Sequence, residues 1–138
     1  MAASEPESRL QGGQLNSAIA SSVVRVLADY TGRGPTRAKT TIDGDWVFVT
    51  LQDALTKGER KLAESGRSEF VLESRKVVQD AMRDELRGAI ERHTGRRVAA
   101  FMSDNHIEPD VGIEIFMLAR SDVPESADYV APGAPQLS

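Results

Sequence analysis

The chain has 138 residues, of which 21 are acidic and 17 basic, giving a net charge of −4, and it contains no cysteine. This length suits one domain, the acidic balance disfavours a protein that neutralises nucleic-acid phosphates, and the lack of cysteine excludes disulfides and thiolate zinc sites. No apolar run is long enough to predict a transmembrane helix, and the first residues lack the basic and apolar regions of a signal peptide. We therefore expect a cytoplasmic protein without direct membrane insertion.

Both ends of the chain are polar and rich in glycine or proline. Residues 1–13 and 121–138 hold too little apolar surface to offset the entropy of ordering, so we predict that both are disordered tails. Residues 14–120 are predicted to form a single domain. That domain is expected to begin with a helix over about residues 14–31, where apolar side chains recur at three- and four-residue steps.

A β-hairpin is predicted directly after this helix. Gly32 stands where a C-cap glycine is expected, and Pro35 prevents the helix from resuming. Two strands, about 36–42 and 46–51, alternate on either side of an Asp-Gly pair, which is a strong hairpin signal. Both faces of the second strand are apolar, which predicts that it lies inside the sheet or has its second face covered.

Two helices follow the hairpin. Thr56 and Glu59 have the spacing of a capping box, which predicts that a short helix starts there. A second helix is predicted from a Ser68 cap to about His93, closed by Gly95. About 26 residues at 1.5 Å each give about 39 Å, so this helix either spans the sheet or reaches a partner.

Two more strands, about 97–103 and 111–118, complete the domain. The order α-ββ-α-α-ββ predicts an α+β two-layer sandwich, with a mainly antiparallel four-stranded sheet and the long helix packed on it. The order of the strands within the sheet does not follow from the pattern.

A basic, glycine-containing segment is the first candidate site. Its glycines allow close backbone approach and its bases add charge, so the segment could bind an anion such as a phosphate-bearing molecule. The alternative is a capped helix that leads into an edge strand with a basic outer face. The residues concerned are Gly32, Arg33, Gly34, Thr36, Arg37 and Lys39.

A second candidate is the segment that holds Asp104, His106, Glu108 and Asp110. Carboxylates and an imidazole could hold a divalent metal or act as acid and base. Only one segment supplies these groups, and the spacing of known metal motifs is missing, so a solvated hairpin loop is the favoured interpretation. We predict no metal site and no cofactor.

Two further groups have an ordinary and a functional interpretation. His93, with Arg92, Arg96 and Arg97 beside it, suits the C-terminal end of a helix dipole better than an active-site base. Trp46 and Phe48 share one face of a strand and could stack on single-stranded nucleic acid, but burial in the core or in an interface is favoured. No nucleophile and base stand in a recognisable pattern, so we expect no enzymatic activity.

Several of these features together resemble one bacterial family. They are Gly32-Arg33-Gly34-Pro35-Thr36, the strand pair after it, Leu55-Thr56 with Glu59 and Leu62, the long helix, Asp104, and the closing Glu114-x-Phe116 strand. In this combination, over about residues 14–120, the chain resembles the MpsC-like family, named for a cation-translocating, membrane-potential-generating system whose membrane components are linked to inorganic-carbon uptake.

The resemblance implies a non-catalytic accessory or regulatory module that works with membrane transporter subunits, at the inner face of the membrane through such a partner. The long helix and the two-faced apolar strand favour a homodimer. A small-ligand sensor that binds an anion at Gly32–Lys39 and a single-stranded nucleic-acid binder remain as alternatives, the latter disfavoured by the net charge.

Overall fold

The computed structural model describes residues 11–120. In chain order its elements are α2 (Gly12–Thr31), β1 (Arg37–Asp43), β2 (Trp46–Gln52), α3 (Lys57–Glu64), α4 (Ser68–Thr94), β3 (Val98–His106) and β4 (Val111–Leu118). The predicted α+β class and element order are confirmed. The predicted tails lie outside the described residues, except that α2 already begins at Gly12, two residues before its predicted start.

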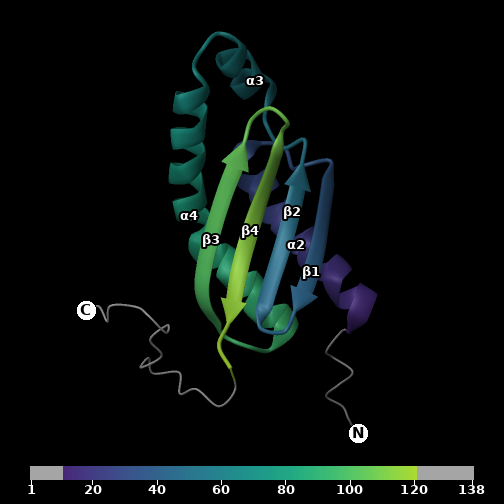
Figure 1. Cartoon of the computed structure of the whole chain (residues 1–138). Helices are drawn as coiled ribbons and strands as arrows, with labels where there is room; N and C mark the ends of the chain where they lie inside the picture. The colour runs from purple at the N-terminus through teal and green to yellow at the C-terminus, as the bar shows by residue number, and fades with distance from the viewer. Residues whose placement is uncertain (1–10, 121–138) are drawn as a thin grey trace, which may run out of the picture.

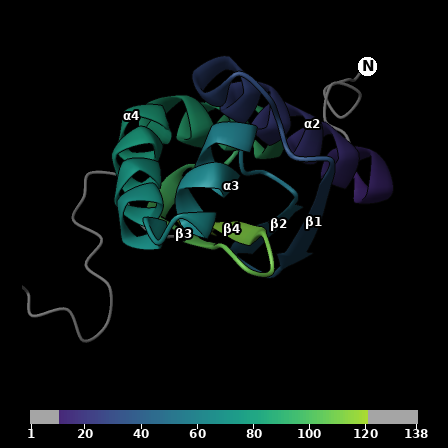
Figure 2. The same ribbon diagram turned by 90° about the horizontal axis from the view of Figure 1, so that it is seen from above.

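The four strands form one antiparallel sheet in the order β1-β2-β4-β3. β2 is therefore an inner strand, as its two apolar faces predicted. β3 extends to His106, three residues beyond its predicted end, so Asp104 and His106 belong to an edge strand and not to a loop. Helices α2 and α4 cover one face of this sheet, and the opposite face carries no helix in the described part of the chain (Figures 1 and 2).

The helix ends follow from local sequence. Gly32 and Gly95 take left-handed backbone conformations, with φ of 87° and 72°, and cap α2 and α4. Thr56 and Glu59 form the predicted capping box at the start of α3. Ser68 does not cap α4 as predicted: it is the first helical residue, and Arg67 precedes it without a side-chain cap.

The core lies between the sheet and the two long helices. It consists of the buried faces of α2, α4 and all strands except the edge strand β1, whose Ala38 and Ile42 pack at its margin. α4 has 27 residues, about 40 Å at 1.5 Å per residue, and it buries side chains along most of that length, from Val71 to Ile90. The helix thus spans the domain. No helix in residues 11–120 combines the length and apolarity of a membrane span.

Candidate functional site

The two glycines of the Gly32–Lys39 segment both have structural roles. Gly32 caps α2, and its N–H donates to the carbonyl of Ala28 at 2.9 Å. Gly34 passes close to α2: a Cβ built there would lie 2.8 Å from Val24 Cγ1 and 3.3 Å from the Val24 carbonyl oxygen. Since real Cβ atoms do not approach other atoms so closely, Gly34 is required by packing against the helix.

The bases of this segment do not converge. The Arg33 guanidinium donates to the carbonyl of Leu55 at 2.6 Å and to Asp53 at 3.3 Å, so its charge is already paired. Arg37 and Lys39 lie in β1, with exposed side chains, and they alternate with Ala38 and Thr40, whose side chains face the helices. The segment therefore divides between an internal ion pair and the uncovered face of the sheet.

Lys39 also borders a hollow of about 330 Å³ between α2 and β1. Most of the other residues that line this hollow carry hydroxyl or amide groups. The full set of other lining residues is Asn16, Ser17, Ala20, Ser21, Ala38 and Thr40.

Arg33 belongs to an ion-pair network that fixes the connection between β2 and α3. Asp53, a non-glycine residue at φ 60°, pairs with both Arg33 and Arg60. Asp110 accepts from Arg60 at 3.1 Å and from the N–H groups of Ala54 and Leu55 at 3.1 and 3.0 Å. The pKa of Asp53 lies below its usual value, because its carboxylate accepts a hydrogen bond from Thr36 and lies beside the positive charges of Arg33 and Arg60. The network ties the β2–α3 connection to the β3–β4 turn.

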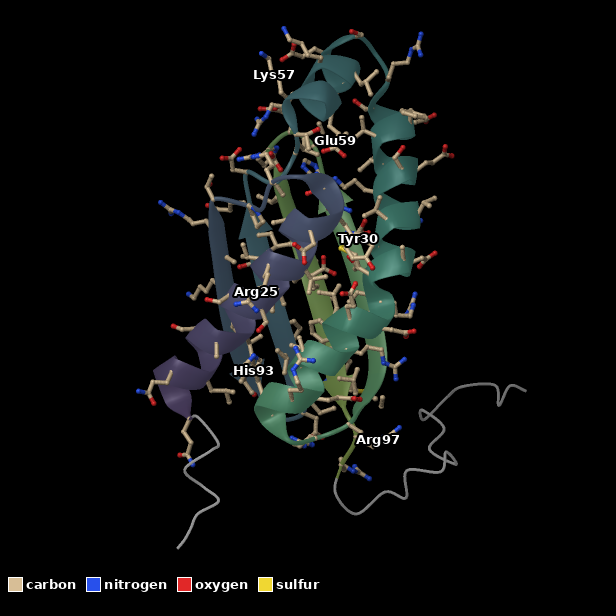
Figure 3. All side chains as sticks on the ribbon, turned by 180° about the vertical axis from the view of Figure 1, so that it is seen from behind. Arg25, Tyr30, Lys57, Glu59, His93 and Arg97 are labelled. Atoms are coloured by element: carbon tan, nitrogen blue, oxygen red, sulfur yellow. The ribbon has the colours of Figure 1, made fainter. Side chains whose placement is uncertain are left out.

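A second clamp joins α3 to α4 (Figure 3). Arg75, almost fully buried, donates to Glu59 through Nε at 2.9 Å and through Nη2 at 2.5 Å, and to the carbonyl of Ala54 at 2.8 Å. Partial burial would raise the pKa of Glu59, but the hydrogen bonds from Arg75 and Thr56 outweigh it, and the pKa lies below the usual range. The residues of the predicted capping box thus hold three parts of the chain together.

The four polar residues of the second candidate segment point to different places. Asp110 is engaged in the network above, whereas Asp104 and His106 lie exposed on β3. His106 Nδ1 lies 2.9 Å from the carbonyl oxygen of Pro109, and Asp104 accepts from the N–H of Asn105. Over residues 11–120 no three His, Asp or Glu side chains gather so that they could hold a metal ion.

On the helical side of the molecule, polar contacts of His93 and Tyr30 join α2 to α4 (Figure 3). His93 Nε2 lies 2.8 Å from Ser22 Oγ, so His93 joins the helices instead of serving only as the predicted end cap. Burial, followed by the charges of Arg92 and Arg25, lowers the pKa of His93. Nearer the other end of the helix pair, Tyr30 donates to Glu85 at 2.5 Å.

The most unusual titratable group was not predicted as a site, because in the sequence it stood out only as part of the closing strand. Glu114 in β4 is fully buried on the helix-facing side of the sheet. Neither of its oxygens, nor the hydroxyl of Ser103 paired with it across the strands, has a well-formed hydrogen bond among the described residues. Burial raises the pKa of Glu114 to about 7, although Ser103 and the charge of Arg75 act in the opposite direction. The sequence held one indication of this burial: Glu114 stands in a strand whose two faces are both largely apolar.

The face of the sheet opposite α2 and α4 is not covered by helices in the described part of the chain (Figure 2), and it carries exposed and half-buried apolar side chains. At one end of it the rings of Trp46 and Phe48 stack with centroids 6.2 Å apart and an interplanar angle of 10°. Toward the other end lies a shallow hollow of about 450 Å³ that includes Ile113. Its other lining residues are Thr50, Leu51, Gln52, Asp104, Asn105, His106, Val111 and Gly112.

A family model described as Na⁺-translocating membrane potential-generating system (MpsC) matches residues 11–120, which is the whole of the domain just described. The chain belongs to this family. No curated protein and no solved structure matches it. The MpsC assignment links the chain by family to a membrane-potential-generating system, and it confirms the resemblance derived from the glycine segment, the capping box and the closing strand.

Proposed function

We propose that this chain is a non-catalytic accessory or regulatory module of a bacterial membrane-potential-generating or inorganic-carbon transport system. The observation that carries the proposal is the sheet face left uncovered by helices, where Trp46, Phe48 and the odd-numbered side chains of β4 present apolar surface. Extended apolar surface of this kind marks association sites in proteins. The polar clusters, by contrast, are occupied in joining segments of the fold.

The proposal places the chain in the cytoplasm, at the inner face of the membrane, held there by transporter subunits, with a homodimer as its working form. Three observations support this: the family match, the apolar face, and the absence of a membrane-spanning helix in residues 11–120. It follows that disrupting the apolar face should separate the working homodimer and thereby release the chain from its membrane partner, while leaving the fold intact.

Co-purification tests this directly. An affinity-tagged chain, expressed in its own type of host, should carry an integral-membrane transport subunit from detergent-solubilised membranes. Ile115→Asp, in the middle of the apolar face, should abolish that recovery, because it places a charge where apolar groups associate. Val77→Asp is the matched control, since Val77 is 68% exposed on α4, away from that face. Equal recovery with both variants would contradict the proposal.

A small-ligand sensor is the second candidate, favoured by the polar hollow that Lys39 borders. We propose an anionic ligand, because hydroxyl and amide groups line the hollow and Lys39 lies on the edge strand at its margin. Inorganic phosphate should then raise the melting temperature of the chain, and Lys39→Ala should remove that shift. No change with phosphate at millimolar concentration would contradict this candidate.

A further inference from the structure

The uncovered sheet face has an ordered layout that the strand register defines. One row across the sheet runs Lys39, Thr50, Ile113, Asp104, and the next runs Thr41, Phe48, Ile115, Met102. On this face the inner strand β4 is apolar throughout, whereas β2 carries Trp46 and Phe48 at one end and Thr50 and Gln52 at the other. On this face the β1 edge carries Arg37 and Lys39, with Asp43 at its far end, and the β3 edge carries Asp104 and His106. In the row nearer the centre the two edges therefore carry opposite charges, Lys39 on β1 and Asp104 on β3.

We infer that this face binds a second copy of the same chain, face to face, about a two-fold axis that runs parallel to the strands. Such an axis lies in the interface and exchanges the two edges of the sheet. Each protomer's Lys39 then meets Asp104 of the other copy, and each Phe48 meets Ile115 of the other copy, by the register of the rows. Because a two-fold interface is self-complementary, each of these contacts occurs twice.

The alternative face-to-face axis, perpendicular to the strands, would pair Arg37 with Asp43 at the rim but would leave Lys39 and Asp104, in a row nearer the centre, without charged partners. It would bring Asp104 against Met102 and Trp46 against Gln52 of the other copy, leaving a carboxylate on a thioether and the only tryptophan on an amide. The parallel axis places Trp46 on Met117 instead.

The available area indicates a reversible dimer. Four strands about 4.8 Å apart and about eight residues long, at about 3.3 Å per residue, give a flat face of about 500 Å². Two such faces bury about 1,000 Å² when each is treated as flat, without the extra area of protruding side chains. This is slightly below the range of about 1,200–2,000 Å² for specific interfaces. We therefore expect dissociation in the micromolar range. This inference deepens the proposed accessory role by assigning the sheet face to a second copy.

A charge exchange tests the inference with the purified full chain. Sedimentation velocity over about 1–200 µM should show a monomer–dimer equilibrium for the wild type. Lys39→Glu and Asp104→Lys should each weaken the dimer about tenfold, because each puts like charges together twice. The double variant K39E/D104K should restore the wild-type constant to within about threefold. Val77→Asp should leave the equilibrium unchanged.

Four results would overturn the inference, and the last of them leaves the accessory role in place. The first is a wild-type chain that stays monomeric at 200 µM. The second is a dimer that neither charge change weakens, which would indicate pairing through strand edges or helices. The third is a monomer whose Trp46 fluorescence is quenched by a single-stranded oligonucleotide, which would assign the face to nucleic acid. Co-purification with a membrane subunit by a monomeric chain would overturn the dimer while leaving the accessory role in place.

Discussion

The buried carboxyl of Glu114 should make the stability of this protein depend on pH in an unusual direction. A carboxyl whose pKa is higher in the folded state than in the unfolded chain stays protonated in the fold, and the stability it contributes is lost as pH rises. For Glu114 the values are about 7 in the fold and 4.5 as the ordinary value. The loss should therefore begin near pH 4.5 and be complete slightly above pH 7.

The size of the effect follows from that difference. At about 1.4 kcal/mol for each pKa unit, it amounts to about 3 kcal/mol. Glu114→Gln keeps the shape of the protonated carboxyl and cannot ionise. The variant should match the wild type within about 1 kcal/mol near pH 4.5 and be more stable by about 3 kcal/mol at pH 8.

Urea unfolding at fixed protein concentration, followed by circular dichroism from pH 4.5 to 8, measures this difference. His93, whose lowered pKa gives the opposite slope near its ordinary value of 6.5, affects variant and wild type alike and cancels. Glu73→Gln, at an exposed position of α4, is the matched control and should give no pH-dependent difference. A difference between E114Q and wild type that stays constant over the whole range would refute the reasoning.

Two further substitutions test the structural roles assigned to the candidate segments. Gly34→Ala should destabilise the fold by about 1–3 kcal/mol, because the new methyl group meets the α2 backbone. Gly13→Ala is its control: this glycine has open space around it, so the variant should be neutral or slightly stabilising in a thermal melt. Arg75→Met should cost about 3 kcal/mol, since it leaves Glu59 without its buried partner. Arg83→Met, on an exposed pair with Asp80 and over the ring of Phe101, should cost about 1 kcal/mol or less in urea unfolding.

Each pair of variants has an outcome that would contradict the structural role proposed for its residue. If both alanine variants melt together with the wild type, the close approach of Gly34 to α2 does not constrain the fold. If R75M and R83M lose equal stability, the clamp between α3 and α4 contributes no more than a surface ion pair.

Local features of the fold were predictable because their causes are local. The cap glycines Gly32 and Gly95 and the Thr56–Glu59 box each act within one turn of chain, so their residue types identify them. The strand order was not predictable. The order depends on β4 lying between β2 and β3, and the periodicity of one strand does not indicate which other strand lies beside it in the sheet.

The candidate sites illustrate the same limit. Arg33 could only be named as a candidate anion-binding residue, because its partners are distant in the chain: Asp53 is 20 residues away and the Leu55 carbonyl 22. Glu114 was overlooked because both faces of its strand are apolar, so alternation alone does not say which face the helices cover. The uncovered apolar face of the sheet can be predicted only when it is known which face of β4 the helices cover.

The accessory role is tested most directly by the membrane potential of the host. A strain lacking this chain should show a reduced sodium-dependent potential, or reduced bicarbonate uptake, with a voltage-sensitive dye and labelled bicarbonate as the readouts. Wild-type chain and V77D should restore the signal, whereas I115D should not. Wild-type potential and uptake in the strain that lacks the chain would contradict the proposed function.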